Sequence, residues 1–317
     1  MVGNANLDIA STTHLHEVNI VLNSSEITTF VTDKVFTCEF NRAIKALPSS
    51  GTSEIIKHAL GIRGLQEFLA TKYKVQILDI IEESDGYKTF ILDKPPEFNF
   101  FPGQYVNCRS GNSLNGMIIK PLLLAISSGC NENYIELTAR SSFLAWNSNY
   151  CLNKKIGDYV EIEGPLGTHF PFENINNKKV LLIGGGSGIT PLRSILKSVS
   201  TDISIKLLYS TKFYDNLLYK NDCEKWINFG HIICLTQEKR QYEKFQYQRV
   251  TKILETFELD YDMIFLCGSI DLIKDVINIL INKKDVSSTN IFASLPIDAL
   301  HGGPVYRGDH PIFNHSS

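Results

Sequence analysis

The chain has 317 residues, a length that suggests two domains, each large enough for its own hydrophobic core. Hydrophobic residues make up 43% and charged residues 21%, close to an average globular protein, which excludes a fibre or a mainly disordered chain. The net charge of −3 comes without a long basic run, and no apolar run approaches the roughly 20 residues that span a bilayer, so we expect neither a nucleic-acid partner nor a membrane span.

Residues 1–72 form the first predicted domain, a small N-terminal α+β extension. Residues 16–22 and 28–31 alternate as short strands do, and residues 54–60 and 65–69 have helical spacing. No chemical motif occurs in this region, and the sequence assigns it no role.

Residues 73–173 have an all-β pattern. Short β-branched runs follow one another closely and are separated by Pro- and Gly-containing turns. The predicted strands are 75–81, 89–92, 105–108, 122–127, 134–139 and 159–163. Such spacing is typical of a small antiparallel β-barrel.

Residues 174–317 alternate between buried-type strands and helices, ending in a C-terminal tail. The predicted strands are 180–183, 205–209, 232–235, 263–267 and 290–293, and the predicted helices are 191–198, 217–227, 250–257 and 272–281. Strands that alternate with helices predict a doubly wound parallel sheet. The predicted fold class is therefore α/β plus β.

A glycine-rich segment joins the first of these strands to the first helix. Its residues are Gly184, Gly185, Gly186, Ser187, Gly188, Ile189 and Thr190, followed by Pro191. Glycines let the backbone approach a pyrophosphate closely, and a helix N-terminus supplies free N–H groups and a positive dipole. Thr190 suits the N-cap of this helix and Pro191 its first turn. The strand–glycine–helix order favours a dinucleotide site over a purely structural turn.

In this context Gly184–Leu192 resembles the nicotinamide-dinucleotide motif of the ferredoxin–NADP reductase-like flavoproteins. Cys267-Gly268-Ser269 resembles the family's late Cys-Gly-Pro, with serine in place of proline. The resemblance implies that Cys267 and Gly268 lie near the nicotinamide and Lys212 near the adenosine ribose. The alternatives are a plain buried thiol for Cys267 and a solvated side chain for Lys212.

The barrel segments Phe101–Val106 and Gly164–Gly167 are also similar to the family, but its flavin signature, Arg-x-Tyr-Ser, is altered. Lys120, Leu122 and Leu123 stand in place of Arg, Tyr and Ser, which removes the bidentate fork, the stacking ring and a hydroxyl donor. The second flavin element corresponds to Asn147, Ser148 and Asn149, which offer donors to a pyrophosphate. The resemblance implies FAD, with FMN or no flavin as alternatives.

The last predicted strand resembles the branch that includes the dihydroorotate dehydrogenase electron-transfer subunit and hydrogenase gamma-type subunits. That branch holds a [2Fe–2S] cluster on cysteines, yet none of the seven cysteines here follows Cys267. We therefore expect no cluster. We assign no metal site either, because His301, His310 and His315 are irregularly spaced on a polar tail. The cysteines form no CxxC pair and no leader segment is visible, which predicts a cytoplasmic protein with reduced thiols.

The resemblance implies an NAD(P)H-dependent oxidoreductase that passes hydride to FAD and then electrons to a partner redox protein or redox enzyme subunit. Such chemistry needs no side-chain acid or base, so we assign no catalytic residue. The alternative is a non-catalytic dinucleotide-binding regulatory or partner subunit whose flavin site has degraded. Both NADH and NADPH remain candidates, because Lys212 is accompanied by Asp215.

Overall fold

The computed structural model describes residues 7–11, 18–22, 70–84, 86–109, 122–140, 153–200, 203–294 and 305–307. The chain divides into two compact units, residues 1–70 and 71–317. In the first unit β1 (Leu7–Ser11), which the sequence pattern did not predict, pairs antiparallel with β2 (Val18–Leu22). The strand expected at 28–31 and the helices expected at 54–60 and 65–69 lie outside the described residues.

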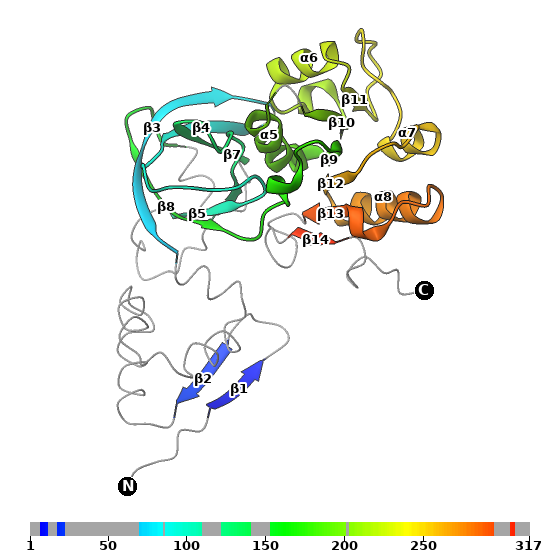
Figure 1. The fold of residues 1–317 in the computed structure, drawn as a ribbon. Coiled ribbons are helices and arrows are strands. Elements are labelled where there is room, and N and C mark those ends of the chain that lie inside the picture. Colours follow the sequence, from blue (N-terminus) through cyan, green and yellow to red (C-terminus); the bar gives the residue numbers. More distant parts are fainter. Residues whose placement is uncertain are drawn as a thin grey trace. The chain divides into compact units, whose positions relative to one another are not determined.

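Six antiparallel strands begin the second unit and form a nearly closed barrel, drawn from cyan to green in Figure 1. They are β3 (Lys72–Glu82), β4 (Tyr87–Asp93), β5 (Tyr105–Arg109), β6 (Leu122–Ala125), β7 (Tyr134–Arg140) and β8 (Tyr159–Leu166). Their order is β6-β5-β8-β3-β4-β7, and a bridge between Ile126 and Leu137 brings the two edges together. The predicted barrel is confirmed.

The barrel closes because alternate side chains are apolar and share one interior. On β3 Val75 and Ile77 are at most 1% exposed, and on β4 Phe90 and Leu92 join the same core. Successive side chains of a strand point to opposite faces, so this alternation directs one row of each strand inward.

The second layer is a six-stranded sheet whose first five members in chain order are parallel. Its strands are β9 (Lys179–Gly185), β10 (Ser204–Thr211), β11 (Ile232–Leu235), β12 (Met263–Cys267), β13 (Ile291–Ser294) and the antiparallel β14 (Val305–Arg307). The order is β11-β10-β9-β12-β13-β14. Every residue of β12 is buried, as expected for a parallel strand covered on both faces. β14 was not predicted.

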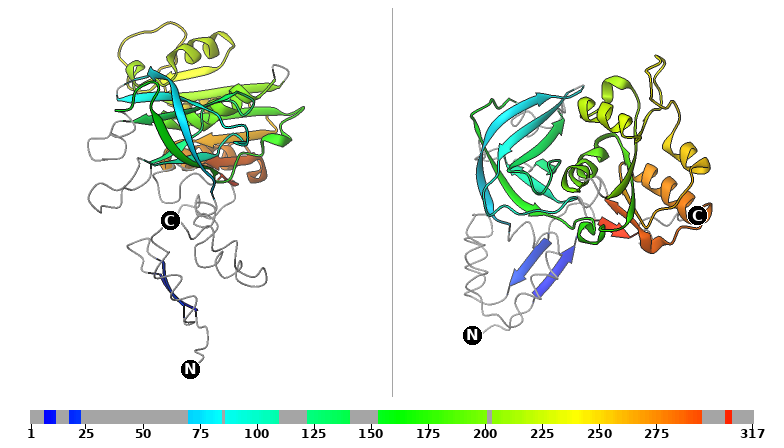
Figure 2. Two further views of the ribbon diagram at one scale, coloured as in Figure 1. Left: turned by 90° about the vertical axis from the view of Figure 1, so that its left-hand side faces the viewer. Right: turned by 45° about the horizontal axis from the view of Figure 1, so that its top comes forward.

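Helices cover both faces of this sheet, so the predicted doubly wound arrangement is confirmed. One hydrophobic core holds the apolar faces of α5 (Ile189–Ser198) and α6 (Lys220–Asn228), and the other holds those of α7 (Val250–Thr256) and α8 (Ile270–Asn282). Figure 2 shows the two helical layers from further directions. Short 3-10 helices are η2 (Phe172–Asn174), η3 (Gly186–Gly188), η4 (Tyr214–Asn216) and η5 (Ser288–Asn290). Within the described ranges, every helix is too short or too polar to cross a bilayer.

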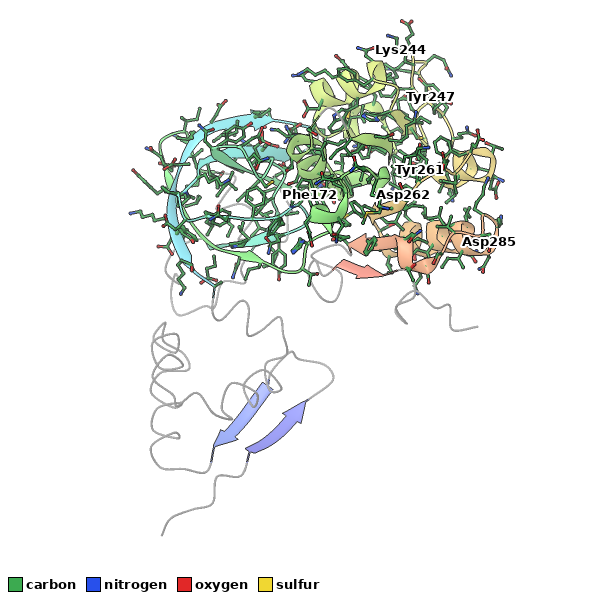
Figure 3. All side chains as sticks on the ribbon, in the orientation of Figure 1. Phe172, Lys244, Tyr247, Tyr261, Asp262 and Asp285 are labelled. Carbon is green, nitrogen blue, oxygen red and sulfur yellow. The ribbon has the colours of Figure 1, made fainter. Side chains whose placement is uncertain are left out.

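The strand order of the parallel sheet reverses between β9 and β12: β10 and β11 lie on one side of β9, and β12 and β13 on the other. These strands are neighbours although about 80 residues separate them. Asp262, labelled in Figure 3, lies just before β12 and accepts a hydrogen bond at 2.8 Å from the N–H of Lys179, the first residue of β9. In open α/β sheets, ligands bind at the carboxyl ends of the strands beside such a reversal. The next features to consider are therefore the ends of β9 and β12.

Candidate functional site

The glycine-rich segment lies at the carboxyl end of β9, where it bends through η3 into α5. Gly186 has a φ of +55°, in the left-handed region that glycine adopts without strain. A Cβ added at Gly186 would meet no protein atom within 4 Å. The backbone of this loop is therefore open to a ligand at Gly186.

At position 188 glycine is required because the backbone of another strand lies too close for a side chain. A Cβ at this position would overlap the carbonyl oxygen of Cys267 at the end of β12. A Cβ on Gly268 would lie 3.3 Å from the backbone nitrogen of Gly185. Two segments thus touch through their backbones at the reversal point: Gly184–Thr190, predicted to contact the pyrophosphate, and Cys267–Gly268, predicted to lie near the nicotinamide.

The N-terminus of α5 carries no side-chain cap. The helix begins at Ile189 with Gly188 as N-cap, two residues earlier than the predicted helix 191–198, and no side-chain hydrogen bond caps it. Thr190 is therefore not the N-cap; it lies within the first turn, and its Oγ1 is 3.4 Å from the hydroxyl of Tyr219. Uncapped N–H groups and the positive end of the helix dipole favour an anion at this place.

Cys267 lies at this edge as a protonated thiol. Cys267 is 5% exposed, and burial raises the pKa of its thiol to about 12. Hydrogen bonds with the Ser294 side chain and the Gly268 backbone lower the pKa, but by less than burial raises it. Because almost no thiolate exists near neutral pH, Cys267 can pack beside a ligand but does not act as a nucleophile.

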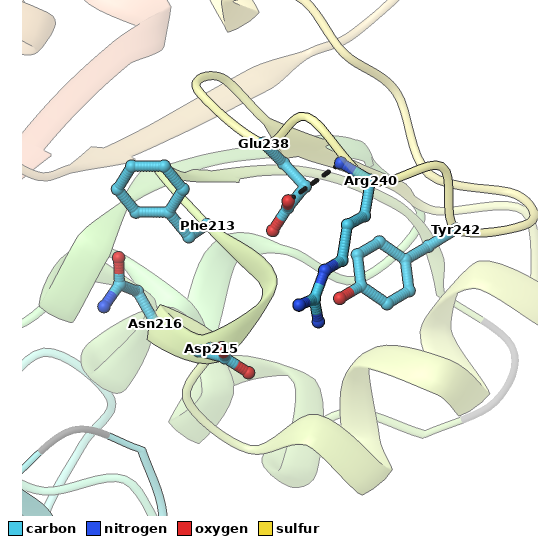
Figure 4. Close-up of a pocket in the computed structure, with 6 residues that line it drawn as sticks. All are labelled: Phe213, Asp215, Asn216, Glu238, Arg240 and Tyr242. Atoms are coloured by element: carbon cyan, nitrogen blue, oxygen red, sulfur yellow. Dashed lines mark hydrogen bonds between the residues drawn. The ribbon is translucent and has the colours of Figure 1, made fainter.

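A cavity of about 460 Å³ lies further along the same edge, beyond the ends of β10 and β11 (Figure 4). It is lined by Phe213, Asp215, Asn216, Glu238, Arg240 and Tyr242. Lys212, which the sequence suggested for this end of the site, is exposed and lies outside that lining.

Among the lining residues that the sequence reasoning missed, three follow β11: Glu238, Arg240 and Tyr242. They belong to the irregular segment after β11, which contains no recognisable motif. They could have been found from the predicted topology, because the segments that follow parallel strands all lie at the same edge of the sheet.

The carboxylate of Glu238 is held by backbone donors inside this cavity. It accepts hydrogen bonds from the N–H groups of Tyr214 at 3.1 Å, Lys239 at 2.9 Å and Arg240 at 3.0 Å. Hydrogen bonds from the backbone of Arg240 and Tyr214 lower its pKa. The Tyr214 ring also stacks on Tyr242 at a centroid distance of 4.1 Å, which fixes the segment after β10 against the segment after β11.

The residues proposed for the flavin are only partly described. Lys120, Asn147, Ser148 and Asn149 lie outside the described residues. Leu122 is half-buried against the barrel core, so Leu123, its neighbour on β6, points to the opposite face. The strand Leu122–Ala125 therefore offers aliphatic carbon where the family signature places a ring and a hydroxyl.

A buried ionic cluster joins α5, the helix that follows the glycine loop, to the barrel. Arg193 pairs with Glu136 of β7 and, at 2.7 Å, with Asp222 of α6; it also donates to the Ser127 carbonyl at 3.2 Å. Its guanidinium lies 4.3 Å from the Tyr219 ring centroid. Burial by itself lowers the pKa of Arg193, but the facing carboxylates more than offset this and raise it. The cation therefore stays charged and fixes the loop relative to the barrel.

Tyr219 lies at the centre of this joint. Its φ of +56° is unusual for a non-glycine residue, and its N–H donates to the Glu83 carboxylate at 2.7 Å. Its hydroxyl lies 2.6 Å from the Thr138 hydroxyl of β7. These contacts hold the strained backbone and explain why α6 begins at Lys220, three residues after the predicted start.

A cluster of three or more histidine, cysteine, aspartate or glutamate side chains suited to a metal ion is not found among the residues that the structure describes. His301, His310 and His315 are not among them.

Residues 182–278 match the family model of the oxidoreductase NAD-binding domain. The chain is 28% identical over 209 residues to the probable dihydroorotate dehydrogenase B (NAD(+)), electron transfer subunit, of Methanocaldococcus jannaschii, a match covering 64% of this chain and 71% of that protein. It is 26% identical over 235 residues to sulfhydrogenase 2 subunit gamma of Pyrococcus furiosus, covering 67% and 79%.

Solved structures of related architecture cover the barrel and the parallel sheet together. The FAD/NAD-binding domain of nitric oxide dioxygenase from Vibrio cholerae has a TM-score of 0.60 at 19% identity, covering 70% of this chain and 97% of that one. A ferredoxin NADP+ reductase from Neisseria gonorrhoeae with bound FAD and NADP has a TM-score of 0.59 at 18% identity, covering 71% and 98%. At these identities the likeness shows a shared fold.

Proposed function

Because the chain belongs to the ferredoxin–NADP reductase-like oxidoreductases, with electron-transfer subunits among its relatives, we propose that it is an NAD(P)H-dependent flavoprotein subunit. It would take hydride from NAD(P)H onto FAD and pass electrons to a partner redox protein. Residues 73–173 would hold the flavin and residues 174–317 the dinucleotide. The observation that carries the proposal is the open backbone at Gly186, beside an uncapped helix N-terminus at the sheet's reversal point.

The arrangement of the strand ends fits an extended dinucleotide. The pyrophosphate would lie over Gly186 and the start of α5, where backbone N–H groups and the helix dipole favour negative charge. On one side β10 is the neighbour of β9, with Tyr209 opposite Gly184, and leads to the 460 Å³ cavity, which suits the adenosine. On the other side Cys267 at the end of β12 suits the nicotinamide.

When bound, the two cofactors supply the chemistry, hydride transfer followed by electron transfer to the partner. The residues of the chain supply position. The Arg193–Glu136 pair and the Tyr219 contacts fix the glycine loop relative to the barrel, so that two bound rings would meet in one geometry. The buried Cys267 thiol limits water beside the ring without taking part in proton transfer.

A second candidate is a dinucleotide-binding regulatory or partner subunit without flavin. The aliphatic strand Leu122–Ala125 favours it, because a ring-stacking and a hydroxyl contact are both replaced there.

An anaerobic titration tests the two candidates. The full chain, incubated with excess FAD and then desalted, should show the visible absorption of bound flavin, and NADH should bleach it. If the desalted protein carries no flavin yet still binds NADH in calorimetry, the second candidate replaces the first. If it binds neither, both are rejected.

A further inference from the structure

The cavity beyond β10 and β11 contains an anion-binding cradle that the protein fills with its own side chain. The N–H groups of Tyr214, Lys239 and Arg240 converge on the carboxylate of Glu238 at 2.9–3.1 Å. Backbone N–H groups that converge in this way form concave sites for phosphate oxygens. Here the converging donors are already satisfied by a carboxylate.

The charges that line the cavity also disfavour a further anion. Its lining carries two carboxylates, Asp215 and Glu238, against the single guanidinium of Arg240. Figure 4 shows the Arg240 side chain extending into the cavity beside Tyr242, while its backbone nitrogen faces the Glu238 carboxylate. A further anion entering the cavity would meet two carboxylates against one guanidinium, and the three N–H groups of the cradle already donate to Glu238.

We propose that Glu238 makes this protein select NADH against NADPH, because its carboxylate occupies the N–H cradle that a 2′-phosphate would need. The proposal rests on the dinucleotide site proposed above. NADH and NADPH differ only in the 2′-phosphate, so discrimination must arise at the adenosine end. The Glu238 carboxylate disfavours a 2′-phosphate in two ways. Its negative charge repels the phosphate, and because it already accepts from the three N–H groups, the phosphate oxygens find no donor there.

Two further charges near the cavity, Asp215 and Lys212, are less suited to set the preference. Asp215 lines the same cavity, but its side chain is 84% exposed and lies 3.8 Å from the Lys220 ammonium, so solvent and that cation screen it. Lys212 is exposed and outside the lining. Asp215→Asn therefore provides a matched control, since it removes one negative charge from the same cavity but leaves the carboxylate in the cradle.

The test is calorimetric binding of NAD+ and NADP+ to the full chain as wild type, Glu238→Gln and Asp215→Asn. The wild type should bind NAD+ at least about tenfold more tightly than NADP+. Glu238→Gln should reduce this preference by about tenfold or more through tighter NADP+ binding, whereas Asp215→Asn should change it by less than about threefold. The quantity compared is the ratio of the two affinities, because both residues line the cavity proposed for the adenosine, which NAD+ and NADP+ share.

The outcomes separate this inference from the function on which it rests. A wild type that binds NADP+ as tightly as NAD+ overturns the role of Glu238, whatever the variants do. Equal shifts in Glu238→Gln and Asp215→Asn overturn it as well, because general charge would then explain the preference. If the wild type binds neither dinucleotide, the proposed site and the inference both fail.

Discussion

Replacing Gly186 by valine should separate ligand binding from folding at the glycine loop. The new side chain would meet no protein atom, so its cost to the folded state is the left-handed φ of +55°, about 1–2 kcal/mol for an L-residue. For a unit of this size that corresponds to a fall in melting temperature of about 2–8 °C. On the open side, the branched side chain fills the space over the backbone. NADH affinity should fall at least about a hundredfold, or about 2.8 kcal/mol.

Isothermal titration calorimetry with NADH measures the affinity, and circular-dichroism melting measures the stability. Gly188→Ala is the matched control two residues away, since its single methyl would overlap the Cys267 carbonyl oxygen. Forcing two backbones apart should lower the free energy of unfolding by about 3 kcal/mol or more, beyond the effect of the larger valine at Gly186.

Two results would refute this reasoning. Unchanged NADH affinity in Gly186→Val would show that the loop is not the pyrophosphate site. If Gly186→Val melted at a temperature as low as that of Gly188→Ala, the space above Gly186 would not be open.

Three further outcomes follow from buried groups. Arg193→Met removes one of the two cations that pair with the buried Glu136 carboxylate and leaves the Lys197 ammonium at 3.0 Å. The free energy of unfolding in urea should therefore fall by about 1.5–3 kcal/mol, less than for a buried charge left unpaired; adding Glu136→Gln should recover part of the loss, and no recovery would contradict the pairing. Burial and the charge of Lys206 lower the pKa of His231 to about 4. The unfolded chain therefore binds the proton more readily than the folded chain. The free energy of unfolding should fall by up to about 2 kcal/mol as pH drops from about 6.5 to about 4. His231→Asn, which keeps an acceptor for the Leu207 N–H, should flatten that fall in urea titrations at several pH values, and an unchanged slope would exclude His231 as its cause. Because burial raises the pKa of Cys267 to about 12, peptide mapping at pH 8 should find it alkylated by iodoacetamide at least about a hundredfold more slowly than in the unfolded chain; equal rates would place the thiol at the surface.

The glycine loop could be predicted because its signal is local. Strand, glycines and helix start follow one another within about a dozen residues, and each element has its own pattern. The exact helix start could not be read in the same way. Thr190 suits an N-cap and Pro191 a first turn, but the helix starts at Ile189, and its N-cap Gly188 lies so close to the Cys267 carbonyl oxygen that only glycine fits there.

The sequence alone determined the fold class, because alternation with a period of two and strand–helix alternation are written directly into the spacing of apolar residues. It also indicated that a glycine-rich turn joins β9 to α5. Only the tertiary structure decided that Glu238 and Arg240 belong to the same edge as Gly186, and that Arg193 meets Glu136 across 57 residues of chain. Such pairs carry no local pattern. They come together because strand order and chain reversal set which strand ends and helix faces are neighbours, and that order arises only when the whole core packs.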